Sequence, residues 1–245
     1  MDPLVEFQNI TKRFKDEVVL NNVQLQIFPD EIFGIIGRSG SGKTTLTRIL
    51  LGFYPPDEGK LIYRGEDITT HTNKIRRIVG LTTQENSFYP RLTAKENLMY
   101  YGRIYDLKKE TLETRVPLLL RLMNLVGHEN VLAEDLSGGM KRRLDFAISL
   151  IHDPDLLILD EPTTGLDPVL TEDIWDIIWK IHSTGKTVII ISHLFDEIEQ
   201  NCGRVGILNK GRFLAVQSPG DLRRQNPAEK NLAQIFKKYV EYYDR

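Results

Sequence analysis

The sequence contains one cysteine, almost no net charge and no long apolar run. The single cysteine, Cys202, excludes an intramolecular disulfide framework, and a lone thiol near a helix end favours packing over chemistry. Lysine and arginine number 32 against 34 acidic residues, a formal net charge of −2, so nucleic-acid binding is not expected despite the basic cluster Lys141, Arg142 and Arg143. No stretch approaches the roughly 18 apolar residues of a membrane helix, and MDPLVEFQNI lacks the features of a secretory signal. Any membrane role is therefore expected to be peripheral.

The order of the predicted strands and helices indicates the fold class. Short strands with polar turns are predicted over residues 4–33. The run IFGII, Ile32–Ile36, then predicts a strand buried on both faces, followed by a glycine-rich turn and a helix over Lys43–Leu51 that Gly52 ends. LLILD (Leu156–Asp160) and TVIIIS predict further buried strands. This alternation predicts an α/β fold with an open, largely parallel sheet, whose ligands bind at the carboxyl ends of the strands.

A helical insertion is predicted between these strands. Thr93 and Glu96 form a capping-box pattern, which predicts the start of a helix, and helical character continues to about Leu150. Pro117, within ETLETRVPLLLRLMNLVG, is expected to kink or split its helix.

Two further helices are predicted nearer the C-terminus. Asp167 is expected to cap a helix that begins at Pro168 and ends near Gly185. Its predicted buried side consists of Ile174, Ile177, Ile178 and Ile181. After the polar stretch SPGDLRRQNPAEKN, the segment LAQIFKKYV predicts an amphipathic tail helix.

Residues 37–44, GRSGSGKT, fit the phosphate-loop pattern G-x-x-x-x-G-K-[ST] directly between a predicted strand and a predicted helix. Glycines let such a loop wrap closely around a phosphate, while its amides and the helix N-terminus point at phosphate oxygens. Lys43 is placed to neutralise β- and γ-phosphate charge, and Thr44 to ligate Mg²⁺. The alternative, a flexible Gly/Ser-rich linker, is disfavoured by the flanking strand and helix.

Adjacent carboxylates follow the predicted strand LLILD. Asp160 is placed to hold Mg²⁺ through water, and Glu161 to polarise an attacking water. A bare acidic pair after a strand is usually a solvated loop, but its position downstream of a phosphate loop favours the catalytic interpretation.

LSGGM, Leu136–Met140, precedes the helical run KRRLDFAISL. Ser137 and the two glycines after it therefore expose free amides at a helix N-terminus, which predicts a second anion site. The alternative is a plain helix cap. Since the first site lies about 100 residues earlier, the pair suggests that each site serves a different phosphate-binding half-site.

Taken together, the phosphate loop, LSGG, LLILDEPTTGLD and ISH resemble an ABC ATPase over residues 4–216. The resemblance implies a P-loop NTPase (RecA-like) core with an antiparallel β subdomain and an inserted α-helical subdomain. It places the core at residues 1–84 and 154–217, the helical subdomain at 85–153 and a tail helix at 218–245.

The same resemblance implies the cofactors ATP and Mg²⁺ and a set of site residues. Nucleotide contacts are expected from Gly37, Arg38, Ser39, Gly40, Ser41, Gly42, Lys43, Thr44 and Thr45. Two subunits of this family sandwich two ATP molecules head to tail, so Ser137, Gly138 and Gly139 would act on the partner's nucleotide. The expected metal ligands are Thr44, Gln84 and Asp160, and the expected catalytic residues are Glu161, His193, Gln84 and Lys43.

Several of these roles compete with ordinary structural ones. Gln84 would touch Mg²⁺ and water and sense the membrane partner, although a lone glutamine is usually a turn residue. His193 resembles the histidine that contacts the γ-phosphate, although a lone histidine is more often structural. Asp167 resembles the residue that couples the two sites, and it can also simply cap a helix. Phe14 lies where the family stacks an aromatic ring on adenine, although a core phenylalanine is the alternative.

The sequence departs from the family pattern at one position and resembles one group of exporters. Met140 stands where many members have glutamine, and the loss of that amide would weaken polar contacts around the partner nucleotide. LSGGMKRRL, LTAKENL and TTGLDP nevertheless resemble the ATPases of ABC-2-type exporters, as does the tail helix. The expected partners are separate transmembrane permease subunits and a second copy or a homologous ATPase, with no nucleic acid. The expected location is cytoplasmic, peripheral on the inner face of the cell membrane.

The coupling surface toward the membrane subunit is expected from Gln84 to about Leu107. Within it, Phe88, Tyr89 and Leu92 place apolar side chains in a loop, as expected of a groove for a partner's cytoplasmic helix. Local packing of these three side chains inside the helical insertion is an equally favoured alternative to the groove.

Two other functions remain open from the sequence. A soluble ABC ATPase, such as one serving iron–sulphur assembly, also uses a single ATPase unit, and co-purification with a polytopic membrane protein would separate it from a transporter motor. A small-molecule kinase would use the phosphate loop alone but leaves LSGGM and His193 without a function.

Overall fold

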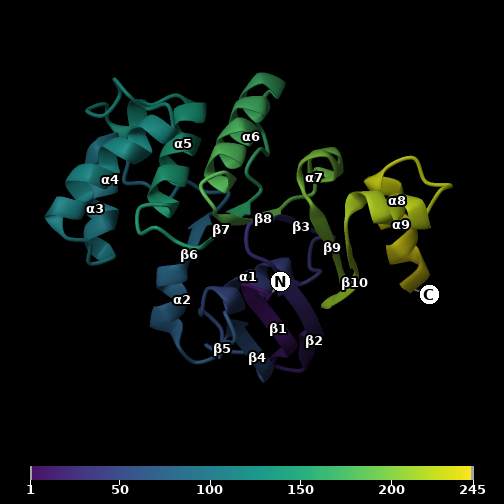
Figure 1. Ribbon diagram of the computed structural model, residues 1–245. Coiled ribbons are helices and arrows are strands. Elements are labelled where there is room, and N and C mark those ends of the chain that lie inside the picture. The colour runs from purple at the N-terminus through teal and green to yellow at the C-terminus, as the bar shows by residue number, and fades with distance from the viewer. Residues whose placement is uncertain (1, 244–245) are drawn as a thin grey trace. The chain divides into compact units, whose positions relative to one another are not determined.

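The computed structural model describes residues 2–243, apart from the side chains at positions 72 and 73. The chain forms two compact units: the first joins the chain up to Arg76 with the segment from Thr187 onward, and the second is Arg77–Lys186. The division falls inside α2 (Thr72–Ile78), a helix that the sequence analysis did not predict. Figure 1 labels the elements in chain order. The predicted boundaries of the core, the helical subdomain and the tail helix follow the family's pattern of elements, not a division into compact units. They therefore stay a prediction.

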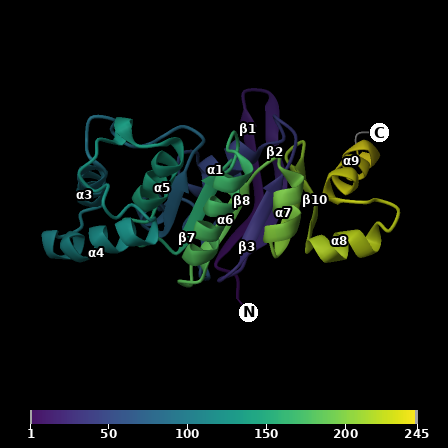
Figure 2. The same cartoon turned by 90° about the horizontal axis from the view of Figure 1, so that it is seen from above.

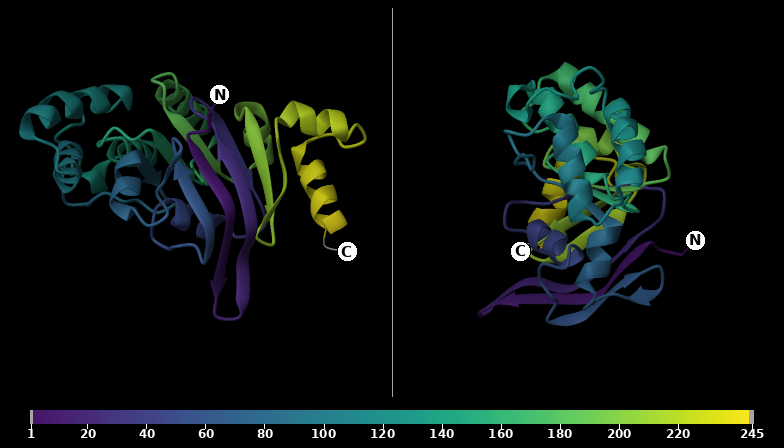
Figure 3. Two further views of the ribbon diagram at one scale, coloured as in Figure 1. Left: turned by 60° about the horizontal axis from the view of Figure 1, so that its bottom comes forward. Right: turned by 90° about the vertical axis from the view of Figure 1, so that its left-hand side faces the viewer.

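The first unit contains an antiparallel sheet with the strand order β2-β1-β4-β5. Its strands are β1 (Val5–Phe14), β2 (Glu17–Ile27), β4 (Glu58–Tyr63) and β5 (Glu66–Asp67). In β2, Val23, Leu25 and Ile27 are buried while the glutamines between them are exposed, so one face of the strand packs on the core. A register shift interrupts the β1–β2 pairing next to Asn9, whose φ of 55° is left-handed, as at a bulge. Figure 3 shows β1 and β2 as long neighbouring arrows.

A second set of strands in this unit pairs in the order β10-β9-β3-β8. They are β3 (Ile32–Ile36), β8 (Thr187–Ile191), β9 (Arg204–Asn209) and β10 (Arg212–Gln217). β3 runs parallel to both β8 and β9 and is buried along its whole length, as the sequence predicted. A Cβ on Gly34 would lie 2.8 Å from Ile198 and 2.9 Å from Val205, so the glycine lets a helix approach the strand closely. Cys202 is buried beside Gly34, where its sulfur would lie 3.2 Å from an added Cβ, and burial raises the pKa of its thiol.

The C-terminal helices pack against α7 (Phe195–Asn201), the helix that follows β8. They are α8 (Pro219–Gln225) and α9 (Leu232–Tyr243). The Glu199 carboxylate on α7 accepts hydrogen bonds from Arg223 of α8 and from the amide of Leu232 at the start of α9. The rings of Phe195 and Phe236 lie 5.0 Å apart between centroids. The two C-terminal helices are therefore packed into the first unit.

The second unit combines the parallel strands β6 (Val79–Thr82) and β7 (Leu156–Asp160) with helices. The helices are α3 (Ala94–Ile104), α4 (Lys109–Leu122), α5 (Gly138–Ser149) and α6 (Pro168–His182), with a 3₁₀ turn at Ala133–Asp135. Figure 2 shows α3, α4 and α5 gathered together. The capping box at Thr93 and Glu96 is confirmed by both of its hydrogen bonds. The Asp167 cap of α6 is also confirmed, because its carboxylate accepts from two first-turn amides.

Pro117 does not split its helix. α4 continues from Lys109 to Leu122 with Pro117 inside it, which settles one of the two predicted outcomes. Val116, Leu119 and Leu120 are buried around the proline. Burial of this apolar face offsets the backbone hydrogen bond that the proline cannot make.

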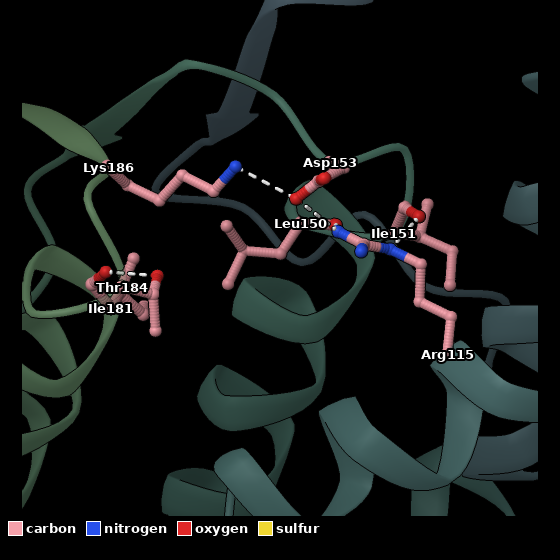
Figure 4. A network of polar contacts seen from close by, with 7 residues as sticks. All are labelled: Arg115, Leu150, Ile151, Asp153, Ile181, Thr184 and Lys186. Carbon is pink, nitrogen blue, oxygen red and sulfur yellow. Dashed lines mark hydrogen bonds and ion pairs between the residues drawn. The ribbon is translucent and has the colours of Figure 1, made fainter.

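A polar network connects α4 to the end of α5 (Figure 4). The Arg115 guanidinium donates to the carbonyls of Ile151 at 2.5 Å and Leu150 at 2.6 Å, just past the end of α5. It also pairs with Asp153 at 2.9 Å, and Lys186 approaches the same carboxylate oxygen at 2.8 Å. Two carbonyls that directly follow α5 are thereby bound by a side chain, as is common for basic residues near helix C-termini. This network holds the far end of the helix whose N-terminus carries LSGG.

Within the described part of the chain, no helix is long and apolar enough to cross a membrane.

Candidate functional site

The phosphate loop leads from β3 directly into α1 (Lys43–Leu50), as predicted. Gly42 has a φ of 106° and caps the helix without any side-chain hydrogen bond, and the first turn of α1 contains no acidic residue. A Cβ at Gly42 would also lie 2.8 Å from Leu20, so glycine is needed here for both backbone conformation and space. The N-terminal amides of α1 and the positive end of its dipole are therefore suited to an anion.

The side chains of the loop fit a polyphosphate. The Lys43 ammonium donates to the loop carbonyls of Gly37 at 2.7 Å and Arg38 at 3.0 Å, so it lies across the loop. Ser41 is buried, and its hydroxyl has no hydrogen-bond partner among the described residues. A buried hydroxyl without a partner costs free energy unless a ligand or water satisfies it. Thr44, the expected metal ligand, is exposed at the start of the helix.

His193 lies at the same edge of the sheet as the phosphate loop. β3 and β8 are parallel neighbours, with Ile35 paired to Ile191, and the amide of Ser192 donates to the carbonyl of Ile35 at 3.3 Å. The carboxyl ends of both strands therefore meet, which brings the predicted histidine to the edge where the loop begins. The imidazole is exposed at this edge.

Phe14 is the last residue of β1 and remains 39% exposed. Its ring meets Tyr54 edge-on, with 5.3 Å between centroids, and the Lys12 ammonium lies 5.5 Å from its centroid. The ring is thus held on one side and accessible on the other, so the core alternative for Phe14 does not apply.

Phe14→Ala is expected to weaken ATP binding about tenfold or more, because stacking of a base on an aromatic ring contributes about 1–3 kcal/mol. Equilibrium titration with ATP measures the dissociation constant. Phe53→Ala is the matched control, since Phe53 is a second phenylalanine of this unit and is 58% exposed. Equal dissociation constants for the Phe14→Ala protein and the unmodified protein would contradict adenine stacking.

The second unit contains three of the predicted site residues, Gln84, Asp160 and Glu161, whereas Lys43 and His193 belong to the first unit. β6 and β7 are parallel, with Thr82 paired to Leu159, so Gln84 and the Asp160–Glu161 pair follow neighbouring strand ends. Gln84 is exposed, whereas Asp160 and Glu161 are half-buried.

Glu161 is held by both its backbone and its side chain. Its φ of 51° is left-handed, a conformation that residues other than glycine rarely adopt and that marks a constrained turn. One of its carboxylate oxygens accepts a hydrogen bond from the Thr164 hydroxyl at 2.7 Å. A carboxylate fixed in this way keeps its second oxygen in a defined direction, which suits a group that accepts a proton from water.

The LSGG segment forms an exposed helix N-terminus. Ser137 caps α5, with its hydroxyl accepting from the amide of Met140 at 3.3 Å. Ser137 and Gly138 are exposed, while Gly139 is buried, and a Cβ on it would lie 3.0 Å from Leu170. The geometry is that of an anion site open to solvent.

Comparison with known proteins identifies the family. The ABC transporter family model matches residues 20–164. The Nod factor export ATP-binding protein I of Cupriavidus pinatubonensis is 40% identical over 219 residues, covering 89% of this chain and 67% of the relative. The protein of the same name from Rhizobium etli is 36% identical, covering 89% and 69%. The chain belongs to the ABC transporter family.

Solved structures of ABC subunits share the fold. An ATP-binding subunit of an ABC transporter superposes with a TM-score of 0.84 at 25% identity, covering 96% of this chain and 99% of that chain. An ATP-binding cassette in its ADP conformation gives a TM-score of 0.85 at 23% identity, covering 97% and 99%. The predicted fold class is confirmed.

As an ABC transporter ATP-binding subunit, the chain is an ATPase coupled to transport, and it works with transmembrane subunits. The family and the names of its relatives disfavour the iron–sulphur assembly and kinase alternatives.

The predicted metal ligands Thr44, Gln84 and Asp160 all offer oxygen atoms, the ligand type that Mg²⁺ prefers. Among the described residues, no group of three or more His, Cys, Asp or Glu side chains is placed to hold a metal by itself. Mg²⁺ usually keeps several waters and takes only one or two protein ligands beside substrate phosphates. Thr44 is exposed in the first unit, and Asp160 is half-buried in the second unit.

Sequence reasoning missed two buried charged residues of α5. Arg142 is 8% exposed and Asp145 is 1% exposed. The sequence places Arg142 in a basic cluster that looks solvated, so its burial could not be read from composition. The only available indication was the helical spacing, which puts both residues on one face, three positions apart.

Proposed function

We propose that this ABC subunit drives export, works as a pair that closes around ATP, and binds to the cytoplasmic side of its membrane partners. The direction is supported by the relatives, which are named as export ATP-binding proteins. Within the chain, we assign the nucleotide-binding core to residues 1–84 and 154–217, the helical subdomain to 85–153 and the tail helix to 218–245. No cargo is assigned, because the membrane subunits choose it.

One observation carries the proposed pairing: in addition to the phosphate loop, the chain has an exposed helix N-terminus at Ser137 and Gly138, with no acidic residue in the first turn of α5. A single copy needs only one phosphate cradle for each nucleotide. This turn at Ser137–Gly139, the signature turn, is therefore assigned to the triphosphate held by a second copy, and α5 is the signature helix.

In the proposed cycle each copy contributes defined groups. Lys43 exchanges its loop carbonyls for phosphate oxygens, and the amides of residues 37–45 surround the phosphates. Glu161 orients the attacking water and accepts its proton, while His193 contacts the γ-phosphate. Mg²⁺, held by Thr44, Gln84 and Asp160, would neutralise the charge that develops on the phosphates.

We assign the contact with the membrane subunit to the exposed apolar side chains of the segment from Gln84 to about Leu107. Tyr89, Tyr100 and Ile104 are 46%, 41% and 56% exposed. Tyr89 meets Tyr100 edge-on, with 4.8 Å between centroids, and the Tyr101 hydroxyl donates to the carbonyl of Ser87. Exposed aromatic side chains of this kind suit an apolar helix of a partner. Phe88 is buried and belongs to local packing instead.

The pairing is tested with an aspartate in the signature turn. In the Glu161→Gln background, which retains ATP, the protein is expected to sediment as a dimer when ATP is present. Adding Gly138→Asp is expected to leave it monomeric, because a carboxylate would face the partner's triphosphate. A Cβ at Gly138 meets nothing within 4 Å, and an acidic residue is favourable in the first turn of a helix, so the variant is expected to fold normally. Sedimentation velocity with and without ATP measures the outcome.

The matched control is Thr111→Asp, which adds the same charge to the exposed first turn of α4 and should leave the dimer intact. A Gly138→Asp protein that still forms the dimer, or a Glu161→Gln protein that binds ATP and stays monomeric, would overturn the proposed pairing.

A further inference from the structure

Arg142 lies on the helix that carries the signature turn, and its guanidinium holds the backbone on both sides of the proposed hydrolytic residues. It donates to the carbonyl of Thr83 at 2.5 Å, one residue before Gln84. It also donates to three consecutive carbonyls that begin at the last residue of β7: Asp160 at 3.3 Å, Glu161 at 3.2 Å and Pro162 at 3.1 Å. One buried side chain therefore connects two loops that are remote in sequence.

Asp145 makes a second connection from the same helix, one turn further on. Its carboxylate accepts hydrogen bonds from both the amide and the hydroxyl of Ser87, each at 2.8 Å. Burial raises the pKa of Asp145, and the Ser87 hydrogen bonds and the Arg142 charge act against this shift. The loop that contains Gln84 is thus attached to α5 at both ends, through Thr83 and through Ser87.

The contacts of Arg142 explain the unusual turn at Glu161. Glu161 has a left-handed φ of 51°, and the carbonyl oxygens of residues 160–162 all point to the Arg142 guanidinium. A strained backbone persists where surrounding groups fix it. Arg142 fixes the backbone of Glu161, while Thr164 fixes its carboxylate.

We propose that Arg142 is a positioning residue that fixes the Glu161 turn and the Gln84 loop relative to each other through their backbone carbonyls. Because Arg142 sits on the signature helix, the element that meets the partner's nucleotide also sets the geometry for hydrolysis. This inference rests on the proposed function for the roles of Gln84, Glu161 and the signature turn. Arg142 itself touches no reacting atom in this account.

The planar fork of arginine matters for this role. Arginine presents five donors in a rigid arrangement, whereas the lysine ammonium is a point charge on a flexible stem that cannot reach four carbonyls in two directions at once. Arg142→Lys therefore keeps the charge but loses the link, and Arg142→Met loses both.

The neighbouring Arg143 is a matched control on the same helix. It is also largely buried, but it points to α6 and pairs with Asp173 at 2.7 Å. Arg143→Met removes the same charge and one ion pair without touching either loop.

The test measures kcat, the ATP dissociation constant and the melting temperature of the full chain for Arg142→Lys, Arg142→Met and Arg143→Met. For Arg142→Lys we expect kcat to fall about tenfold, and for Arg142→Met about 10²-fold, since small misplacements of reacting groups cost rates of this order. ATP affinity is expected to stay within about twofold, because the phosphate loop is unchanged. Arg143→Met is expected to lower the melting temperature while keeping kcat.

Three results would overturn the proposal. The first is a kcat for Arg142→Lys close to that of the unmodified protein. The second is an Arg142→Lys protein whose loss of kcat matches its loss of folded fraction or of ATP affinity. The third is an Arg143→Met protein with the same selective loss of kcat.

A separate measurement distinguishes this proposal from the proposed pairing. The Glu161→Gln, Arg142→Lys double variant is expected to form the ATP-dependent dimer, because its signature turn is intact. Absence of that dimer in Glu161→Gln alone counts against the pairing, whereas its absence only in the double variant counts against a positioning role for Arg142.

Discussion

Glu161→Gln is expected to bind ATP with nearly unchanged affinity while its turnover falls by about 10²- to 10⁴-fold, the range that a positioned general base contributes. The amide keeps the size of the side chain and can still accept from the Thr164 hydroxyl, which lies 2.7 Å from the carboxylate. Only the capacity to take a proton from water is removed. Phosphate release under saturating ATP measures turnover, and equilibrium titration measures affinity.

Glu172→Gln serves as the control. Glu172 is an exposed residue of α6, and its substitution removes one negative charge from the second unit, as Glu161→Gln does. Its turnover should equal that of the unmodified chain. Undiminished hydrolysis by the Glu161→Gln protein would show that another group activates the water.

Lys43→Ala is expected to weaken ATP binding by about 10- to 100-fold, because a hydrogen bond to a charged group contributes about 1.5–3 kcal/mol. Unlike the change at Glu161, this change removes the partner of the bound phosphates, so the dissociation constant itself should rise. Isothermal titration with ATP measures it. Since Lys43 also donates to the carbonyls of Gly37 and Arg38, a melting curve should accompany the titration.

Lys237→Ala is the matched control, with a lysine side chain that is 73% exposed on the tail helix. It should bind ATP as the unmodified chain does. A Lys43→Ala protein that is folded and has an unchanged dissociation constant would argue against phosphate binding by this loop.

Local chemistry made much of the fold predictable. The start of α1 follows from the phosphate-loop glycines, and the starts of α3 and α6 follow from Thr93 and Asp167, because capping involves groups only two or three residues apart. The same reasoning could have found α8, where Ser218 caps the helix, Pro219 begins it and the Ser218 hydroxyl accepts from the amide of Asp221. The residues alone predict that segment as a polar stretch, while the family resemblance includes it in a single tail helix at 218–245.

Burial was harder to predict, because it depends on contacts between remote segments. Phe88 and Tyr89 are adjacent aromatic residues, yet one is buried and the other is exposed. Of the two outcomes expected at Pro117, a kink or a split, the split does not occur, because α4 continues through the proline with its apolar side buried.

The sequence by itself determined the family and predicted the phosphate loop, the acidic pair at the end of β7 and an anion site at the Ser137 turn, because each is a contiguous pattern. Tertiary structure decided what holds those patterns in place. The basic cluster of Lys141, Arg142 and Arg143 does not by itself indicate which arginine binds the Glu161 carbonyl. That choice depends on packing, which brings the ends of β6 and β7 to one face of α5 and leaves their carbonyls to be satisfied by a single guanidinium.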